Sequence, residues 1–491
     1  MGEIYKTKEQ VHNRALEAVN LTLEELSSEG YEPSKKSSFG DAFENWFGKL
    51  PDSESKPDLE EAGVELKATP FKKLKSGKFS AKERLVLNLI NYNELIHETF
   101  ETSKFLYKNK TIELAFYENN PEVDKREWFI KTVILYQMEK NPKDFEIIRQ
   151  DWEKIYQFVD EGRAHELSEK YFQYLSPCTK SKNSSVTRSQ PHSDIEAKPR
   201  AFSFKSGFMT ALLRDYVLGE KKCDSIIKDK YELKDKNIEE IIFEKFEPYI
   251  GKTVIELCEY FGINSKSKSL NQLLASAMLN LNGNHTINKE FGEIEEFEKA
   301  SIVVKTVQVN EKNKNKEHMS FPKFNFKELV EEEWTNEEGE PSATWHNFLL
   351  ESRFLFVVFK EVEDDVIFKG IKFHSIPEDV INTTIKEVWQ DTKDKLNEGV
   401  ILKVEPRNNS KGYIVRNNFI KHSDGKICHV RPHAVYSDYK ENGKYSNQLP
   451  TPAKWINHTG NYDELSKDWM TDQSFWLNNT YINQQIADLL D

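Results

Sequence analysis

The chain has 491 residues, of which 37% are hydrophobic and 31% are charged, and its formal net charge at pH 7 is −13. A chain of this length exceeds one ordinary hydrophobic core, so we expect two or three domains. No apolar run is long enough to cross a bilayer, and the first residues lack the apolar core of a signal peptide. The four cysteines form no Cys-x-x-Cys pair. We therefore expect no membrane partner and a location in a reducing cytoplasm.

Residues 39–47 are predicted to form a helix that carries a carboxylate at the edge of its apolar stripe. Two serines, Ser37 and Ser38, are candidates for its N-cap. The aromatic side chains recur at helical spacing: Phe39, Phe43, Trp46 and Phe47. Glu44 projects beside this stripe, so we expect it at the border of the surface on which the helix packs.

A β-strand is predicted over residues 64–69, because apolar and polar side chains alternate there with a period of two. Glu65 and Lys67 therefore share one face of the strand. Residues 60–63 form a polar turn, across which Asp58 can approach Glu65. Two carboxylates and a lysine in this arrangement are typical of a nuclease metal site. The carboxylates hold a divalent cation, and the lysine lies near the water that attacks phosphorus.

The Glu-x-Lys triplet alone is a weak signal, because such pairs on a strand most often form a solvated face with a weak ion pair. The triplet also occurs at residues 54–56 and 232–234. Only the copy at residues 65–67 combines strand alternation, a preceding Pro-Asp and an upstream helix with a carboxylate. We therefore take four residues as candidate catalytic residues, the first three of them as metal ligands: Glu44, Asp58, Glu65 and Lys67.

A basic segment follows the strand, in contrast to the negative charge of the whole chain. Its cations are Lys72, Lys73, Lys75, Lys78, Lys82 and Arg84. A phosphate backbone next to a metal site needs positive charge, so Lys72 and Lys73 are candidates for DNA binding. The alternative is an ordinary solvated loop.

The second half of the chain repeats elements of the first. Residues 201–214 and 474–487 each predict an aromatic strand, a short polar turn and an amphipathic helix. Two related domains are the simplest explanation, with a first domain over residues 1–219, a charged linker over 220–236 and a second domain over 237–491. Residues 179–198 are almost free of large apolar side chains and are predicted to be an exposed loop.

The second half is predicted to have lost its own metal site. Setting Lys305 against Lys67 places Val303 where Glu65 stands. Glu296 falls at the position of the aspartate, but the upstream helix offers no carboxylate. A valine cannot ligate Mg²⁺, which demands oxygen ligands. We therefore expect the second half to keep the fold without the chemistry.

His429 and His433 have a spacing that would place two imidazoles on one face of a helix, as in some zinc sites. Pro432 lies between them, which makes a regular helix improbable, and the sequence offers no third ligand nearby. We prefer a strand end or a phosphate contact as the interpretation of these histidines.

The chain resembles the MutH family in the spacing of the four candidate catalytic residues, in the segment Gly-Asp-Ala-Phe-Glu-Asn-Trp-Phe-Gly at residues 40–48, and in Ala-Phe-Ser-Phe-Lys at 201–205. End to end, including residues 429–433 and 473–476, it is similar to the two-domain type II restriction endonucleases of that family that cut at GATC. The resemblance implies an α/β fold with two PD-(D/E)xK domains, each a mixed central sheet flanked by helices. It also implies Mg²⁺-dependent cleavage of double-stranded DNA and a C-terminal domain that binds DNA as an effector without cutting.

The resemblance also implies which residues contact DNA. In the family, bases are read by loops around the element that holds Pro177 and the strand that ends at Lys205. When Pro177 is aligned with Pro432, Ser176 falls at the position of Arg431. The candidates are Lys180, Arg188, Arg200 and Lys205 in the first half, and Arg431, His433 and Asn478 in the second.

Three classes of function remain open on the sequence. The favoured one is a type II restriction endonuclease that gives 5′-phosphate ends and engages two DNA sites, either as a monomer that dimerises on DNA or by nicking twice. A MutH-type mismatch-repair nicking endonuclease is the second, although such enzymes resemble a single MutH domain. The third is a non-catalytic sequence-specific DNA-binding protein, against which the intact set of candidate catalytic residues argues.

Overall fold

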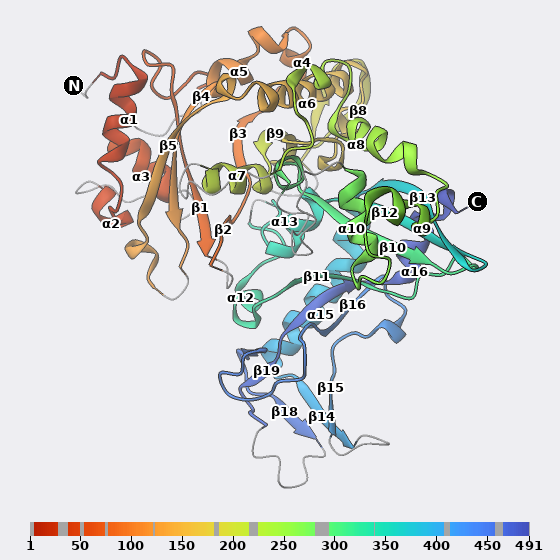
Figure 1. The fold of residues 1–491 in the computed structure, drawn as a ribbon. Coiled ribbons are helices and arrows are strands. Elements are labelled where there is room, and N and C mark those ends of the chain that lie inside the picture. The colour runs from red at the N-terminus through yellow and green to blue at the C-terminus, as the bar shows by residue number, and fades with distance from the viewer. Residues whose placement is uncertain are drawn as a thin grey trace.

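The protein is a mixed α/β molecule in which helices and strands alternate through both halves of the chain (Figure 1). No helix of the described residues is long and apolar enough to cross a membrane. The computed structural model describes residues 4–27, 38–49, 54–73, 77–120, 123–180, 186–215, 224–279, 294–337, 339–406, 413–456 and 465–490.

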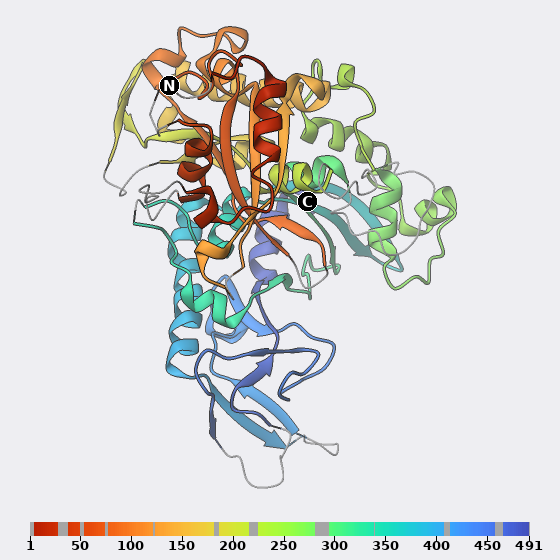
Figure 2. The same cartoon turned by 90° about the vertical axis from the view of Figure 1, so that its left-hand side faces the viewer.

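The first half is built on one sheet with the strand order β2–β1–β4–β5. β1 and β4 are parallel, and the other neighbours are antiparallel. The strands are β1 (Glu65–Lys73), β2 (Phe79–Ala81), β4 (Thr111–Glu118) and β5 (Ile130–Gln137). Helices α1 (Lys8–Leu16) and α3 (Ser38–Trp46) cover one face of this sheet, where Val11, Phe43 and Leu66 form a buried core (Figure 2). The helix α3 confirms the one predicted over residues 39–47, while its proposed N-cap lies outside the described side chains.

A second, antiparallel sheet with the order β3–β9–β6 completes the first half. Its strands are β3 (Leu85–Leu89), β6 (Leu175–Thr179) and β9 (Arg200–Phe204). The remaining helices of this half are α2 (Leu23–Leu26), α4 (Tyr92–Leu95), α5 (Lys104–Asn109), α6 (Pro142–Asp160) and α7 (Ser206–Leu213). The long helix α6 begins at Pro142, whose ring is favoured in the first turn, and its Asn141 cap accepts a hydrogen bond from the Asp144 N–H.

The second half repeats both sheets. Its parallel pair β10 and β12, extended by antiparallel β13, matches β1, β4 and β5, while the order β11–β20–β16 matches β3–β9–β6. Each half closes with a strand that leads into a helix, which confirms the predicted repeat. The elements are β10 (Ile302–Val309), β11 (Met319–Lys323), β12 (Arg353–Val362), β13 (Asp365–His374), β16 (Cys428–Pro432), β20 (Gln473–Leu477) and α16 (Asn479–Gln485).

Two further groups of elements distinguish the second half. The helices are α8 (Ile238–Phe246), α9 (Val254–Phe261), α10 (Leu270–Met278), α11 (Glu295–Lys299), α12 (Phe326–Glu331), α13 (Thr344–Glu351), α14 (Glu378–Val380) and α15 (Lys386–Glu398). An extension at the end of the molecule opposite the first half consists of β14 (Ile401–Pro406), β15 (Tyr413–Asn417), β17 (Ser446–Gln448), β18 (Lys454–Ile456) and β19 (Trp469–Thr471) (Figure 1).

The two halves share a continuous core of buried apolar side chains, which includes Phe204, Ile227, Leu233 and Leu355. The described part of the predicted linker, residues 224–236, contributes Ile227 and Leu233 to this core and is therefore packed. Buried polar contacts also cross between the halves, since the Lys299 ammonium lies 2.8 Å from a carboxylate oxygen of Asp144. The division at residues 1–219, 220–236 and 237–491 stays a prediction.

The prediction of an exposed loop over residues 179–198 is confirmed for exposure at most of residues 186–198, but it is wrong that this part lacks strands. Residues 188–197 form a hairpin of β7 (Arg188–Gln190) and β8 (Ser193–Ala197), with His192 at a φ of 58° in its turn. The buried side chain of Gln190 accepts a hydrogen bond from the Ala164 N–H at 2.7 Å and donates to the Ile195 carbonyl. These bonds fix a short polar hairpin that apolar content alone does not reveal.

Candidate active site

A tight turn holds Asp58 against Glu65. Leu59 and Val64 exchange backbone hydrogen bonds of 2.9 and 3.2 Å, and Gly63 adopts a φ of 64° between them, a conformation that favours glycine. The Asp58 N–H donates to Glu65 Oε2 at 3.2 Å, and the Leu66 N–H donates to Asp58 Oδ2 at 3.0 Å. The predicted approach of Asp58 to Glu65 is confirmed.

Glu65 and Lys67 lie on one face of β1, as the alternation predicts. Leu66 is buried on the opposite face, in the core under α1 and α3. The Lys67 ammonium donates to Glu65 Oε1 at 2.5 Å, and the side chain of Glu65 is fully buried. Lys67 therefore lies directly beside Glu65, as the chemistry of a nuclease metal site requires.

Glu44 reaches the same place from α3. Burial first, and then the negative charges of Asp58 and Glu65, raise the pKa of the Glu44 carboxyl to about 7. The three carboxylates are thus close enough to repel one another, and the structure brings all four predicted residues together. Their catalytic roles stay a prediction.

Two lysines at this site were missed by reasoning from the sequence. The Lys108 ammonium, at the end of α5, lies 3.5 Å from Glu65 Oε1 and donates to the Glu54 carbonyl at 2.8 Å. The Lys49 ammonium lies 3.7 Å from Asp58 Oδ1. Lys108 is far from β1 in the sequence and arrives there through the parallel pairing of β1 with β4, so no local pattern marks it.

The electrostatics of the site depend on these pairs. Burial raises the pKa of the Glu65 carboxyl. Burial alone would lower the pKa of Lys67, but the attraction of Glu65 and Asp58 outweighs it and raises that pKa. Among the described residues, no three His, Cys, Asp or Glu side chains converge closely enough to hold a metal ion. Lysine ammonium groups instead lie against the carboxylates and offset their charge.

A second buried carboxylate lies on the opposite face of the same sheet. Glu113 of β4 is opposite Leu66, and the His12 ring of α1 lies 3.0 Å from its Oε1. Burial raises the pKa of the Glu113 carboxyl to about 7, although the contact with His12 lowers it. The sequence analysis did not single out this pair, because its members are far apart in the chain.

The basic segment after β1 is divided in the structure. Lys72 and Lys73 end β1 and pair with β2, and Lys73 is exposed. Arg84 is instead largely enclosed between Glu169 and Glu351, so its charge is paired inside the protein. The prediction of a single basic loop is therefore wrong for Arg84. The residue Lys75 lies outside the described residues.

Three of the first-half candidates for DNA binding contact the second half. The Lys180 ammonium lies 2.7 Å from Glu340 Oε1. Arg200 is buried, donates to the Pro177 carbonyl at 2.8 Å and lies 4.0 Å from Glu378. Lys205 is also buried, and its ammonium donates to the carbonyls of Ala300 and Glu351 at 3.4 and 3.2 Å.

Arg188 differs from these three candidates because it is exposed. It lines a surface hollow with Tyr92, Asn93 and their neighbours. Among the first-half candidates, Arg188 and Lys73 are exposed, Lys72 and Lys180 are half-buried, and Arg200 and Lys205 are buried.

In the described part of the second half, no turn corresponds to the one that presents Asp58. Val303 lies opposite the second residue of β12, as Glu65 lies opposite the second residue of β4, so the predicted alignment of these strands is confirmed. Glu296, however, lies on α11 rather than in a turn, and its carboxylate accepts from the backbone N–H groups of Ile226 and Ile227. The prediction that Glu296 occupies the position of Asp58 is wrong.

The second-half candidates lie on and beside β16. Arg431 is exposed, His433 is half-buried with its Nδ1 2.7 Å from Ser474 Oγ, and the buried Asn478 contacts the His429 ring. His429 and His433 thus belong to a strand and its end.

The strand ladders correct the alignment of the two halves at this sheet. Cys178 pairs with Ala201 and Arg431 pairs with Ser474. Ala201 and Ser474 each lie four residues before the cap of the helix that follows. Arg431 therefore corresponds to Cys178, and the alignment with Ser176 is wrong by two residues.

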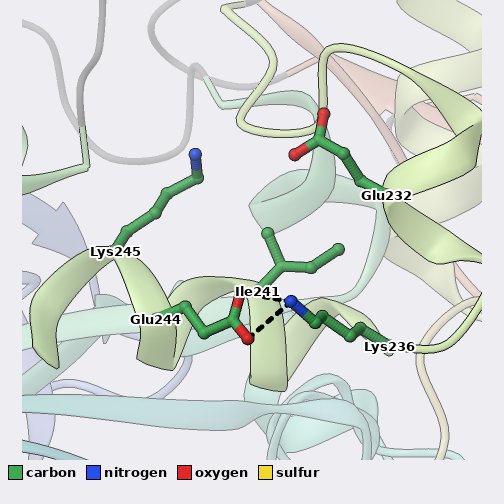
Figure 3. Close-up of a pocket in the computed structure, with 5 residues that line it drawn as sticks. All are labelled: Glu232, Lys236, Ile241, Glu244 and Lys245. Carbon is green, nitrogen blue, oxygen red and sulfur yellow. Dashed lines mark hydrogen bonds and ion pairs between the residues drawn. The ribbon is translucent and has the colours of Figure 1, made fainter.

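A hollow elsewhere on the surface offers no comparable chemistry. Figure 3 shows Glu232, Lys236, Ile241, Glu244 and Lys245 around it, with Lys236 and Glu244 joined by an ion pair of 2.6 Å. Its acidic and basic side chains balance one another, and none of them belongs to the candidate site.

Comparisons with known proteins agree with this geometry. The family model described as the DNA mismatch repair enzyme MutH matches residues 47–151. The sequence is 58% identical to the type II restriction enzyme Sau3AI of Staphylococcus aureus over 490 residues, which are 99% of this chain and 100% of that protein. The chain belongs to the MutH-related type II restriction enzymes.

As a type II restriction enzyme, the protein is a site-specific deoxyribonuclease, and its partner is DNA. The DNA mismatch repair protein MutH of Shewanella woodyi is 29% identical over 218 residues, which are 42% of this chain and 91% of that protein. The mismatch-repair relative thus accounts for less than half of the chain. The MutH segment contains Asp58, Glu65 and Lys67, and Glu44 lies just before it.

Proposed function

We propose that this restriction enzyme hydrolyses double-stranded DNA at GATC with Mg²⁺ and leaves 5′-phosphate ends. The observation that carries the proposal is the contact of Asp58 with Glu65, with Lys67 bonded to Glu65 and Glu44 within electrostatic reach of both carboxylates. Carboxylate oxygens are the ligands that Mg²⁺ prefers, and the mutual repulsion of these three groups is relieved by a bound cation. The GATC site follows from the resemblance to GATC-cutting enzymes of the family.

The residues of the site divide the work of hydrolysis. Asp58 and Glu65 would hold the metal ion, and Glu44 would bind a second ion or support the first. A bound Mg²⁺ supplies polarisation of the scissile phosphate and a water of lowered pKa. The Lys67 ammonium orients the attacking water or stabilises the negative charge that develops on the phosphate. Attack on phosphorus breaks the bond to the 3′ oxygen, leaving a 3′-hydroxyl and a 5′-phosphate.

The rest of the proposal concerns DNA binding. Residues 1–219 would form the cutting domain, residues 220–236 a linker, and residues 237–491 a domain that binds a second DNA site as an effector. The loss of the carboxylate at Val303 supports this division of labour. The contacts proposed in the cutting domain are Lys72, Lys73, Lys180, Arg188, Arg200 and Lys205, and those in the effector domain are Arg431, His433 and Asn478. The protein would be a monomer that dimerises on DNA and so cuts both strands. We place this activity in the cytoplasm.

Cleavage products test the first part of this proposal. A supercoiled plasmid is incubated with the protein in Mg²⁺ or in EDTA, with its GATC sites either adenine-methylated or not. We expect linear fragments in Mg²⁺ whose mapped ends begin with a 5′-phosphate at GATC, and no cutting in EDTA. Ends at another sequence, cutting in EDTA, or nicked circles alone would contradict it. The methylated plasmid shows whether the enzyme discriminates adenine methylation.

The effector role is tested with linear DNA of equal length that carries either one or two GATC sites. We expect faster cutting of the two-site DNA at equal site concentration, because the second half must be occupied for full activity. Equal rates on both substrates would refute the effector role and leave the cutting site untouched.

A further inference from the structure

At the position of the metal site, the second half has a cluster of cationic side chains around Lys305, which we call the cationic cluster. Lys305 lies opposite the fourth residue of β12, as Lys67 lies opposite the fourth residue of β4, and Val303 stands in place of Glu65. The lysine of the site is thus retained while its carboxylate is lost.

Lys305 has no counter-ion among the described residues. Its ammonium makes one long contact, 3.5 Å to the carbonyl of Ser320 on β11, and within the described residues no carboxylate pairs with it. Burial lowers the pKa of Lys305 below its usual range. Lys67, by contrast, is bonded to Glu65. A half-buried ammonium without a carboxylate is stabilised by any anion that enters beside it.

Further cations gather around this lysine. Ser320 pairs with Trp476 of β20, whose ring lies under the Arg431 guanidinium at 4.6 Å and beside the His433 ring at 5.4 Å (Figure 1 shows β11 and β16 on this sheet). Burial first, and then the charges of Lys323 and Lys305, lower the pKa of His433, which places these groups within electrostatic reach.

Little negative charge offsets these cations. In the part of the chain that the structure describes, Arg431 forms no ion pair, and the carboxylate that contacts the cluster is Asp472, 2.9 Å from Lys323. The guanidinium is therefore held over the Trp476 ring with its donors available to a ligand.

Three imidazoles border the same face. The ring of His318 lies 4.5 Å from that of His422 and 4.9 Å from that of His429. His318 Nδ1 accepts the Asn479 N–H at 3.1 Å, so the proton of the neutral ring resides on Nε2, which can donate outward. Burial, and then the nearby charges of His422 and Arg431, lower the pKa of His318.

We propose that this cationic cluster binds a backbone phosphate of duplex DNA without a metal ion, with Lys305 and Arg431 as the residues that contact the phosphate. The inference rests on the proposed function of the second half as a DNA-binding domain. The acidic site of the first half needs a cation before a phosphate can approach its carboxylates. In the second half, the exchange of Glu65 for Val303 leaves the positive charge of the lysine for the phosphate itself.

The cationic cluster is tested in the full-length protein by its binding of a fluorescent duplex with one GATC site. Anisotropy measures this binding in EDTA over a range of NaCl concentrations. We expect Lys305→Met and Arg431→Gln each to weaken binding about tenfold at about 0.1 M salt, because each removes a charged hydrogen bond. Each should also reduce the slope of log affinity against log salt by about one. Lys305→Arg keeps the cation and should stay near the native slope.

Lys245→Met on α8 is the matched control, since Lys245 belongs to the same half but lies at the hollow of Figure 3. Thermal melting checks that each variant is folded. If Lys305→Met and Arg431→Gln bind DNA with the affinity and salt slope of Lys245→Met, phosphate binding by the cationic cluster is refuted. A defect that appears only when Ca²⁺ replaces EDTA would also refute it, because the contact would then require a metal ion.

The ratio of cutting rates on two-site and one-site DNA separates this inference from the effector proposal. If both variants bind DNA like the native protein and keep the preference for two-site DNA, phosphate binding by the cationic cluster is refuted and the effector role stands. A native protein without two-site preference overturns the effector role. The salt slopes would then still show whether Lys305 and Arg431 contact phosphate.

Discussion

The two halves of this restriction enzyme are built on matching sheets, but they differ in charge at corresponding positions of β1 and β10. In the first half, Glu65 and Lys67 of β1 form an ion pair beside Asp58. In the second, Val303 and Lys305 occupy the same ladder positions, and no turn presents an aspartate among the described residues. One strand position thus separates a site suited to a divalent cation from a site suited to an anion.

The halves also differ in what covers the sheet that contains β9 or β20. In the first half, Lys205 and Arg200 at the ends of β9 are buried, and their charges are satisfied by protein groups that include Glu351 and Glu378 of the second half. In the second half, Arg431 on the strand beside β20 is exposed. The same architecture therefore has its cations engaged within the protein in one half and open in the other.

The largest expected effect comes from giving the first half the residue of the second. Glu65→Val should reduce cutting of unmethylated GATC DNA by at least about a thousandfold, because a metal ligand contributes several kcal/mol to the transition state. The initial rate of plasmid cleavage in Mg²⁺ measures it. The reverse change, Val303→Glu, should not create a second cutting centre, since Glu296 is committed to backbone N–H groups. Glu405→Gln, at an exposed ion pair of the extension, is the control and should leave cutting unchanged. Residual cutting by Glu65→Val above about one per cent would show that Glu65 is not a ligand.

The second effect concerns Lys67. Lys67→Ala should lower the cleavage rate by about 10²- to 10³-fold, as expected for a group that stabilises developing negative charge. Binding of the same DNA in Ca²⁺ should stay within a few-fold of native, because the substitution leaves the cations of the second half in place. Rate and anisotropy measurements on one preparation separate the two effects. If cutting stays near native, the lysine has no role in the reaction.

The contact between the halves provides the third test. Glu351 is buried, lies 3.3 Å from the Arg84 guanidinium and accepts the Ser206 N–H at 2.9 Å. Glu351→Gln leaves Arg84 with one carboxylate fewer, so we expect the free energy of unfolding in urea to fall by about 3 kcal/mol. Glu405→Gln, at an exposed ion pair of the extension, is the control and should show no measurable change. Equal midpoints for the two variants would mean that the buried contact does not hold the halves together.

Local patterns predicted the arrangement of the candidate residues well. The apolar stripe of α3 and the alternation of β1 are properties of adjacent residues, so they placed Glu44, Glu65 and Lys67 correctly. Lys108 could not be found in this way, because it reaches Glu65 only when β4 pairs with β1. A side chain that long-range strand pairing brings to a site cannot be recognised from its spacing in the sequence.

The errors have equally physical reasons. Aligning Pro177 with Pro432 shifted β6 by two residues, and a shift of two keeps every side chain on its face, so the hydrophobic pattern could not reveal it. Charged residues were assigned to DNA because they are usually exposed. Arg84 was counted with the basic segment for this reason, but its side chain lies between carboxylates, one of them Glu351 of the other half.

An effect that appears only as the pH changes lies on the back of the first sheet, where Glu113 occupies the ladder position that Leu355 holds in the second half. Burial raises the pKa of Glu113 from 4.5 to about 7, so the folded state favours the neutral carboxyl. Its stabilisation is complete below pH 4.5 and is lost as the pH rises through 7. Relative to Glu113→Gln, the native protein should lose up to about 3 kcal/mol of unfolding free energy over this range. Urea unfolding from pH 5 to 8 measures the difference in unfolding free energy between the native protein and Glu113→Gln. Glu113→Leu should show the same pH dependence as Glu113→Gln, because leucine cannot ionise either. A constant difference across this range would mean that Glu113 is ionised throughout and that His12 compensates its charge.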